Sequence, residues 1–369
     1  MRIDGVEIRR VSVPLVTPFR TATGVEHERN AVLVRTFCGD VEGWGECVAM
    51  TAPLYSSEYA EGAAHVLVHH LAPLLVGRDL GAEAVVPGLA AVKGHPMAKA
   101  ALELAVLDAE LRIEGRSLAA RLGATRDRVP AGVAIGLASS IGELLDTVHG
   151  FVEAGYPRVK LKIEPGWDVE PVRAVRERFG AELLLQVDAN GSYASVSDAV
   201  ARLAPLDDFA LLMIEQPLDD DDLTGHAELG RRLTTPLCLD ESITSARAAE
   251  QAIALDACRV VNIKAGRVGG FLEAVRVHDV CLAAGVPVWC GGMLETGLGR
   301  AANLALAALP GFTLPGDLSA SDRWFAEDLT DPFVLEDGEL AVPRGPGLGV
   351  TPRAQVLTEH TNAIEIVRP

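Results

Sequence analysis

Long apolar runs, an export signal and an excess of cations are all missing from this sequence. No run approaches about 18 uninterrupted apolar residues, and the start, MRIDGVEIRR, lacks the apolar block of a signal peptide. We therefore expect no membrane span and a cytoplasmic location. The chain has 33 Lys and Arg against 51 Asp and Glu, and its net charge of −18 repels polyanions. Nucleic acid is therefore not expected as a partner.

Paired cysteines are also missing. The six cysteines are scattered, with no Cys-x-x-Cys spacing, and a chain of 369 residues needs no disulfides to fold. We interpret them as reduced thiols in the core. Hydrophobic residues make up 49% of the chain, which is ample for two domains or for one large barrel with additions.

The first part of the chain, residues 1–125, has an α+β pattern. It contains strand-like stretches followed by two helical patterns, at 3–13, 31–37, 41–48, 57–75 and 96–113. Two segments rich in Pro, Gly, Thr and Ser, residues 15–30 and 50–56, are typical of irregular loops. Loops of that length in a compact domain are often functional.

From about residue 129 the pattern changes to short apolar runs separated by amphipathic helices. There are eight such runs: VAIG, VKLKI, LLLQVDAN, LLMIEQP, LCLDES, VVNIKAG, VPVWCGG and FTLPGD. This α/β alternation predicts a parallel sheet, and eight strands predict its closure into a barrel over residues 126–318. A doubly wound open sheet is the alternative. Residues 319–369 are expected, from their position, to return to the first domain.

Charged residues end five successive runs at intervals of 24 to 27 residues, at Lys162, Asp188, Glu215, Asp240 and Lys264. Because alternate strand residues face opposite sides, these five share the polar face, which in a barrel is the interior. Each alone could be an ordinary salt-bridged strand end. Together the three carboxylates supply hard oxygen ligands for one Mg²⁺ per subunit, with Mn²⁺ or Co²⁺ as alternatives.

The lysines indicate the type of reaction. Lys160 and Lys162 share a face, so repulsion and burial should lower the pKa of one of them and provide a neutral base. Lys264 lies four strands further round the ring, across the barrel. A small carboxylate held between them would have a lysine on each face of its α-carbon. A bound divalent cation can stabilise the charge that forms when the α-proton leaves.

The stretches VKLKI, QVDANG, IEQPL, LDES and NIKAGRVGG resemble the muconate-lactonising subgroup of the enolase superfamily. The stretches WGECVAMTAPLYSSEY, PVWCGGMLETGLGRAAN and LPGDLSASDR are similar to its N-acylamino acid racemase and o-succinylbenzoate synthase family. The resemblance implies a (β/α)7β modified TIM barrel with an α+β capping domain formed by the N-terminal region and the C-terminal segment. Loops 19–24 and 49–55 should close over the barrel, and the protein should form homo-oligomers, octamers or dimers.

The resemblance also implies roles for particular residues. The metal ligands would be Asp188, Glu215 and Asp240, the catalytic lysines Lys162 and Lys264, and the auxiliary lysine Lys160. We further expect auxiliary and substrate-pocket roles for eight residues: Asn190, Glu241, Phe19, Tyr55, Gly291, Gly292, Met293 and Asp317. By strand parity Glu241 should point outward and assist a lysine from there. LPGDL has one aspartate where dipeptide epimerases carry two, so a free α-amine is not an expected substrate group.

These residues predict racemisation of N-acylated amino acids by proton transfer between Lys162 and Lys264. Dehydration to o-succinylbenzoate is the alternative, or a second activity of the same site. A barrel that binds a carboxylate without catalysis is the hypothesis from another class.

Three further features have ordinary interpretations. The Gly297-x-Gly299 pair is typical of a tight turn, although a helix start there could also bind an acyl or carboxylate group. Residues 219–222 are typical of a solvated helix start, and the pair His69–His70 of a surface or core position.

Overall fold

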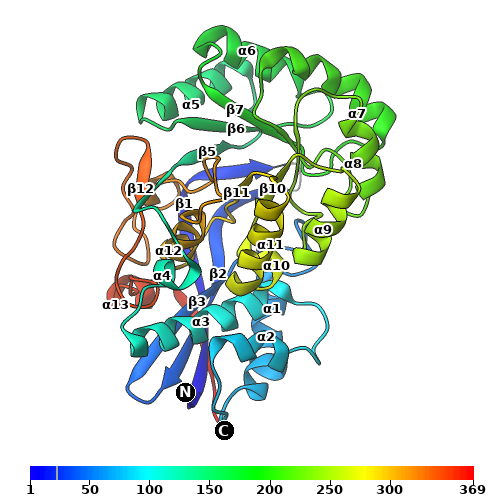
Figure 1. Ribbon diagram of the computed structural model, residues 1–369. Coiled ribbons are helices and arrows are strands. Elements are labelled where there is room, and N and C mark those ends of the chain that lie inside the picture. The colour runs from blue at the N-terminus through cyan, green and yellow to red at the C-terminus, as the bar shows by residue number, and fades with distance from the viewer. Residues whose placement is uncertain (22–23) are drawn as a thin grey trace.

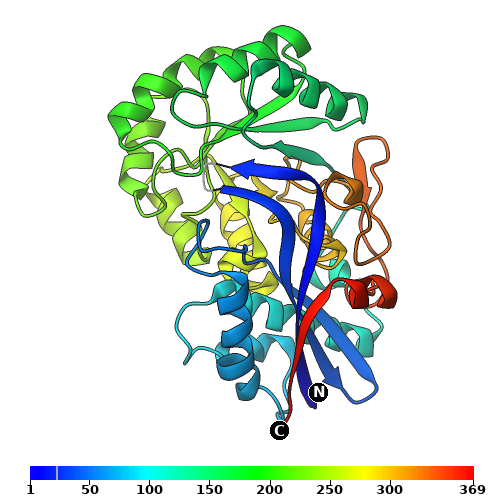
Figure 2. The same cartoon turned by 180° about the vertical axis from the view of Figure 1, so that it is seen from behind.

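The computed structural model describes residues 1–21 and 24–369 and shows two structural units (Figure 1). The lower unit is a sheet of long strands with helices packed against it. The upper unit is a curved sheet with helices on its outer side. Both chain termini lie at the end of the lower unit that is farthest from the upper one (Figure 2). The first and last parts of the chain therefore meet in the lower unit.

The lower unit, the capping domain, is built on an antiparallel sheet in the order β13-β1-β2-β3. The strands are β1 (Gly5–Thr21), β2 (Gly24–Cys38), β3 (Val41–Cys47) and β13 (Thr361–Val367). β13 pairs with β1 from Val6↔Val367 to Val11↔Thr361. The end of the chain thus completes the sheet, in agreement with the predicted cap.

The helices of the capping domain cover one face of this sheet. They are α1 (Ala60–Val66), a π-helical turn (Leu67–Leu71), 3-10 turns (Ala72–Leu74 and Ala82–Ala84), α2 (Val85–Gly88), α3 (Pro96–Glu114) and α4 (Leu118–Leu122). α3 lies directly on β3, because a Cβ on Gly45 would come 2.1 Å from the carbonyl oxygen of Ala101. His69 and His70 are exposed.

Residues 15–30 are not the irregular loop that their composition predicts. Residues 15–21 and 24–30 belong to β1 and β2 and form the far end of their hairpin, where Phe19 pairs with Glu26 after a register shift that follows Pro14. Proline interrupts the ladder but the chain stays extended, as at a bulge. The hairpin extends from the capping domain to the barrel (Figure 1). Residues 22 and 23, part of the expected 19–24 loop, lie outside the described residues.

The upper unit contains seven parallel strands in chain order. They are β5 (Gly132–Ile135), β6 (Arg158–Lys162), β7 (Leu184–Asp188), β8 (Ile214–Glu215), β9 (Leu237–Leu239), β10 (Val260–Ile263) and β11 (Val288–Cys290). The intervening helices are α5 (Ile141–Glu153), α6 (Val169–Phe179), α7 (Val196–Leu203), α8 (Leu223–Gly230), α9 (Ala246–Ala254), α10 (Ala265–Val268), α11 (Phe271–Ala283) and α12 (Gly297–Ala307).

The eighth predicted strand, FTLPGD, closes the ring without forming a regular strand. Phe312 bridges to Val288 in β11, and Gly316 bridges to Ala131 just before β5. The amide of Gly132 donates to the carbonyl of Gly316 at 2.8 Å. The predicted barrel is therefore confirmed, and the open doubly wound sheet is excluded.

The barrel strands separate an apolar outer face from a mixed interior, as their alternation predicts. Leu161, Val187 and Ile263 face the helices and are fully buried. Inside the barrel lies a small separate apolar cluster of Met213, Cys238, Val260 and Trp289. The Trp289 ring is 5.0 Å from the Lys160 Nζ, so this cluster is in contact with the charged residues of the barrel.

The remaining elements are short. β4 (Arg128–Pro130) pairs with β12 (Glu339–Ala341), and α13 (Ala354–Glu359) precedes β13. Two 3-10 turns cover Ala204–Phe209 and Ser321–Arg323. In the part of the chain that the structure describes, no helix combines the length and the apolar character needed to cross a membrane.

Candidate active site

The five regularly spaced residues meet, with Lys160, at the carboxyl ends of strands β6 to β10. All six residues are buried. Their exposed fractions range from 0% for Glu215 and Asp240 to 9% for Lys162. Ions buried to this degree need partners of opposite charge. The carboxylates and ammonium groups here are partners of one another.

On one side of the mouth, Lys162 and Lys160 share Asp188. The Lys162 Nζ donates to Asp188 Oδ2 at 2.6 Å and to Asn190 Oδ1 at 2.6 Å. The Lys160 Nζ lies 3.0 Å from Asp188, 3.1 Å from Glu215 and 2.6 Å from Asp317. Lys160 is therefore enclosed by three carboxylates, whereas Lys162 bonds to one carboxylate and one amide oxygen.

On the other side, Lys264 donates to Asp240 Oδ2 at 2.7 Å and to the Tyr55 hydroxyl at 3.1 Å. The Tyr55 ring lies 4.6 Å from the Lys264 Nζ. Arg267 also bonds to Asp240, and its other nitrogen donates to the carbonyl of Asn262 at 2.6 Å. Tyr55 comes from the capping domain, so this side of the site is built from both units.

The predicted lowering of the pKa of one lysine of the Lys160–Lys162 pair does not apply to Lys160. Burial lowers the Lys160 pKa, but Asp317, Glu215 and Asp188 together outweigh burial and raise it. The Lys264 pKa is also raised: burial lowers it, and the neighbouring Tyr55 and Glu241 more than reverse that effect. The sequence shows two adjacent lysines but not how many carboxylates fold onto them.

The carboxylates respond differently to the same surroundings. Burial raises the Asp188 pKa, but Lys162 and Lys160 bring it below its ordinary value. The Glu215 pKa is raised by burial and by repulsion from Asp188, despite the nearby Lys160. Glu215 thus lacks enough positive charge around it, which suits a residue that binds a cation.

Glu241 does not point outward as strand parity predicts. β9 ends at Leu239, so the alternation no longer applies two residues later. The Glu241 Oε1 accepts from Asn190 Nδ2 at 2.8 Å, and Asn190 in turn accepts from Lys162. Glu241 is therefore linked to Lys162 from the mouth of the barrel, through Asn190.

Two residues that follow the strand ends have backbone conformations that side chains disfavour. Asn190 has φ 45° and Gln216 has φ 39°. Such strain is stored where the surrounding structure enforces it, often at functional sites. The Gln216 side chain accepts from the Asp240 amide at 2.9 Å, so it fixes the start of the loop that carries Asp240.

A cavity of about 260 Å³ opens onto these residues. Its floor is polar, with Lys160, Lys162, Lys264, Asn190 and Asp317. Its upper walls are mostly apolar and come from the capping domain and the last barrel loops: Phe19, Met50, Leu54, Tyr55, Met293, Leu318 and Trp324. The cavity therefore suits a molecule with an anionic end and an apolar body.

Five of the six predicted pocket residues line this cavity: Phe19, Tyr55, Gly292, Met293 and Asp317. Gly291 is not among its lining residues. A Cβ on Gly291 would lie 2.4 Å from Asn262 Oδ1 and 2.6 Å from the Lys264 Cε. Gly291 acts by leaving room for Lys264.

Two family models cover most of the chain. The mandelate racemase/muconate lactonizing enzyme N-terminal domain matches residues 3–123, and the enolase C-terminal domain-like model matches residues 143–356. The chain belongs to the enolase superfamily.

Relatives that align with this chain over nearly its whole length carry the names of enzymes. An N-succinylamino acid racemase from Amycolatopsis is 63% identical, over 98% of each chain. The o-succinylbenzoate synthase of Bacillus subtilis is 42% identical, over 99% of this chain and 98% of that one. A solved superfamily member from Listeria innocua has a TM-score of 0.95 and 40% identity, and the match covers 100% of this chain and 99% of the other. The predicted resemblance is confirmed, and this chain is an enzyme of the superfamily.

The carboxylates Asp188, Glu215 and Asp240 suit the divalent cation that was predicted for them. They end three consecutive parallel strands and offer hard oxygen donors in a buried site. In this structure their oxygens are turned toward Lys160, Lys162, Lys264 and Arg267.

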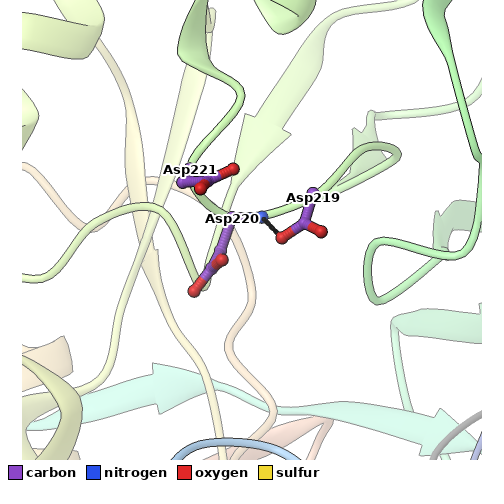
Figure 3. Close-up of side chains that lie close together, drawn as sticks. All are labelled: Asp219, Asp220 and Asp221. Atoms are coloured by element: carbon purple, nitrogen blue, oxygen red, sulfur yellow. Dashed lines mark hydrogen bonds between the residues drawn. The ribbon is translucent and has the colours of Figure 1, made fainter.

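A second cluster of carboxylates lies outside the cavity, and its oxygens are close together. Asp219, Asp220 and Asp221 each offer an oxygen within 4.8 Å of the others (Figure 3). All three are exposed and lie in the turn before α8, where Asp222 caps the helix by accepting from the Gly225 amide at 2.8 Å. This is the solvated helix start that the sequence predicts, because exposed carboxylates are hydrated without a metal.

Three buried residues of the site were not singled out from the sequence. Arg158 forms an ion pair with Asp317 at 2.6 Å, and Asn262 donates to Glu215 at 2.7 Å. Both share strand parity with the neighbouring lysines, so parity could have identified them. Arg267 lies in α10, beyond the strand end, and no pattern in the sequence indicates its contact with Asp240.

Proposed function

We propose that this enzyme racemises N-acylated amino acids, with N-succinylamino acids as the substrate class. The observation that carries the proposal is the pair of lysines that line one cavity from two sides. Lys162 is held by Asp188 and Lys264 by Asp240, on strands separated around the ring. Relatives named N-succinylamino acid racemase support the substrate class.

In the proposed reaction one lysine, in its neutral form, takes the α-proton of the substrate. The electron pair of the broken C–H bond moves into the carboxylate and gives an enediolate. The other lysine, in its ammonium form, then donates a proton to the opposite face of the same carbon. Each turnover exchanges the protonation states of Lys162 and Lys264 and inverts the α-carbon.

We propose that Asp188, Glu215 and Asp240 hold one Mg²⁺ per subunit, or Mn²⁺ or Co²⁺ in its place. When bound, the cation supplies positive charge against the second negative charge of the enediolate. Its charge would also offset the carboxylates that raise the pKa values of Lys160 and Lys264. The neutral lysine required by the reaction is then more accessible near neutral pH.

A second candidate activity is o-succinylbenzoate synthesis by dehydration. It begins with the same removal of a proton next to a carboxylate and continues with loss of the hydroxyl on the adjacent carbon as water. Several relatives of 42 to 46% identity carry one name or the other: o-succinylbenzoate synthases from Bacillus subtilis and Geobacillus kaustophilus and an N-succinylamino acid racemase from Thermus thermophilus. One site could therefore perform both reactions. We do not adopt the non-catalytic barrel, because all the predicted metal ligands and lysines lie at one mouth.

Purified protein loaded with Mg²⁺ or Mn²⁺ and assayed on both substrate types tests these proposals. Racemisation of an N-succinylamino acid that stops on chelation and returns with metal is the expected result. Turnover of neither substrate would contradict the substrate class and leave the fold unaffected.

Three further expectations remain proposals. We propose a capping domain of residues 1–125 completed by 319–369, around a barrel of 126–318. We propose a homo-oligomer, dimer or octamer, which light scattering on the purified enzyme would test. We also propose a cytoplasmic location, where the six cysteines, all free and buried, would remain reduced.

A further inference from the structure

The proposed substrates carry two carboxylates, and the catalytic residues account for one. An N-succinylamino acid has an α-carboxylate beside the reacting carbon and a second carboxylate at the end of the succinyl chain. Four cationic side chains line the cavity: Lys160, Lys162, Lys264 and Arg300. The three lysines are each within 3.1 Å of a carboxylate oxygen. Arg300 differs from the three lysines because its terminal nitrogens bond to backbone carbonyls.

Arg300 is a buried guanidinium without a carboxylate partner among the described residues. It lies in the first turns of α12 and is 4% exposed. One terminal nitrogen donates to the carbonyl of Ser319, and the other donates to the carbonyl of Glu295 at 2.9 Å. Its Nε is buried and has no hydrogen-bond partner in the described part of the chain. Because burying a cation is costly unless an anion balances it, this position favours an anionic ligand.

The helix start beside Arg300 is not available to bind that anion. The amides of Thr296 and Gly299 donate to Glu46, at 3.1 Å and 3.0 Å for the shortest contacts. The Gly297 amide donates to Asp328 at 2.8 Å. The backbone amides of Gly297 and Gly299 thus already bond to carboxylates of the protein. The alternative interpretation of this segment as an anion site is wrong.

The walls next to Arg300 suit the rest of a succinyl group. Met293, Leu318 and Trp324 line the same cavity and can contact its two methylenes. Arg300 itself connects the loop after β11 to the segment that closes the barrel, through Glu295 and Ser319, and both of these line the cavity too. The guanidinium is therefore fixed in the cavity wall before a ligand arrives.

We propose that Arg300 is a specificity-determining residue that binds the terminal carboxylate of the succinyl group. The inference rests on the proposed function and refines it: the preferred acyl groups would end in a carboxylate, and neutral acyl groups of the same length would bind less well. Each terminal nitrogen uses one N–H for a backbone carbonyl and keeps a second, and these supply a charge-assisted bond to the carboxylate.

The test compares two achiral ligands that differ only at the chain end, N-succinylglycine and N-butanoylglycine. Calorimetry on the Mg²⁺-loaded enzyme measures their dissociation constants without net turnover. We expect Arg300→Gln to weaken N-succinylglycine binding about 10- to 100-fold, the range of a charge-assisted bond, and to change N-butanoylglycine binding less than about threefold. Equal weakening of both ligands, or of neither, would overturn the proposal.

Two further variants separate recognition from structure. Arg300→Lys keeps the charge and should retain part of the preference for the succinyl ligand. Arg126→Gln is the matched control, because Arg126 also lacks a carboxylate partner in the described chain and donates to the carbonyls of Ala307, Leu309 and Phe312, but does not line the cavity. It should leave the ratio of the two constants unchanged, and a loss equal to that of Arg300→Gln would overturn the proposal.

Failure of this inference and failure of the proposed function give different results. Racemisation of N-succinyl and N-butanoyl amino acids by the unmodified enzyme tests the function. If both are racemised and the binding ratio does not depend on residue 300, the function holds and the role of Arg300 is wrong. If neither is racemised but the binding ratio depends on residue 300, the reaction is wrong and the recognition holds.

Discussion

The two sides of the barrel mouth hold their lysines by different means. The hydrogen-bond partners of Lys162 in the described chain both come from the barrel, Asp188 and Asn190, with Glu241 behind Asn190. Lys264 depends on both units, because the ammonium group that Asp240 binds also donates to the hydroxyl of Tyr55 from the capping domain and lies over the Tyr55 ring. One base is therefore complete within the barrel, and the other is complete only when the cap is in place.

The largest expected effect comes from removing either lysine. Lys162→Ala and Lys264→Ala should each abolish racemisation in both directions, at least about 1000-fold, because every turnover needs one proton acceptor and one donor. Chiral chromatography of the product measures this loss.

The half-reactions should survive in these two variants. In D₂O each variant should exchange the α-proton of one enantiomer, the one presented to the remaining lysine, with opposite preferences in the two variants. Deuterium entering both enantiomers at similar rates in a single-lysine variant would show that one base reaches both faces.

A smaller effect is expected from weakening the carboxylate on the Lys264 side. Asp240→Asn should keep the fold and reduce Mg²⁺ affinity and activity together, by roughly 10- to 100-fold in affinity, because one anionic donor is lost. Calorimetric titration with Mg²⁺ measures the affinity. Asp221→Asn, in the exposed group of Figure 3, is the matched control and should change neither quantity. Normal affinity in Asp240→Asn would refute its role as a ligand.

Tyr55→Phe should sharpen the difference between the two sides. This substitution removes the hydroxyl that accepts from Lys264 and keeps the ring. Lys162 does not bond to the Tyr55 hydroxyl. We expect proton exchange at the Lys264 face to slow about 10-fold, the cost of one hydrogen bond to a charged group, and exchange at the Lys162 face to stay the same. NMR of α-proton exchange for each enantiomer separates the two rates. Equal slowing at both faces would mean that Tyr55 orients the substrate instead.

The smallest effect on catalysis is expected at the contact between the units, where Glu103 of α3 accepts from the Leu272 amide of α11 at 3.0 Å. Burial raises the Glu103 pKa to about 7, with Arg276 and Glu273 as its charged neighbours. Because this pKa is above the ordinary value of 4.5, the folded state binds the proton more tightly. The stabilisation is complete below pH of about 4.5 and is lost as the pH rises through about 7.

Glu103→Gln should therefore remove part of this pH dependence while changing kcat little. Urea unfolding measures the free energy of unfolding of both proteins at pH 5.5 and at pH 8. The decrease between these two pH values should be smaller in the variant than in the unmodified protein, by an amount on the order of 1–3 kcal/mol. An identical pH dependence in both proteins would show that Glu103 does not titrate in this range.

The barrel and its charged residues could be predicted because they follow from period and parity. The 24- to 27-residue spacing requires one strand and one helix per unit, and parity places Lys162, Asp188 and Lys264 on one face. The strand ends at 15–21 and 24–30 could not be predicted, because the proline, threonines and glycine of this stretch are equally typical of a loop. Glu241 was misplaced because parity ends with the strand. The pKa directions depend on which carboxylates fold onto each lysine, and local sequence does not contain that information.

The pairing of β13 with β1 has a consequence for the order in which the chain can fold. Residues 6–11 pair with residues 361–367, so the two partners are separated by nearly the whole chain. During synthesis β1 can pair with β2 early, but its other edge stays open until residues 361–367 have left the ribosome. The barrel can form before that moment, whereas the sheet that carries the hairpin over its mouth cannot be completed. A chain cut short near its end would therefore keep every predicted catalytic residue and still lack the edge of the sheet that supports Phe19.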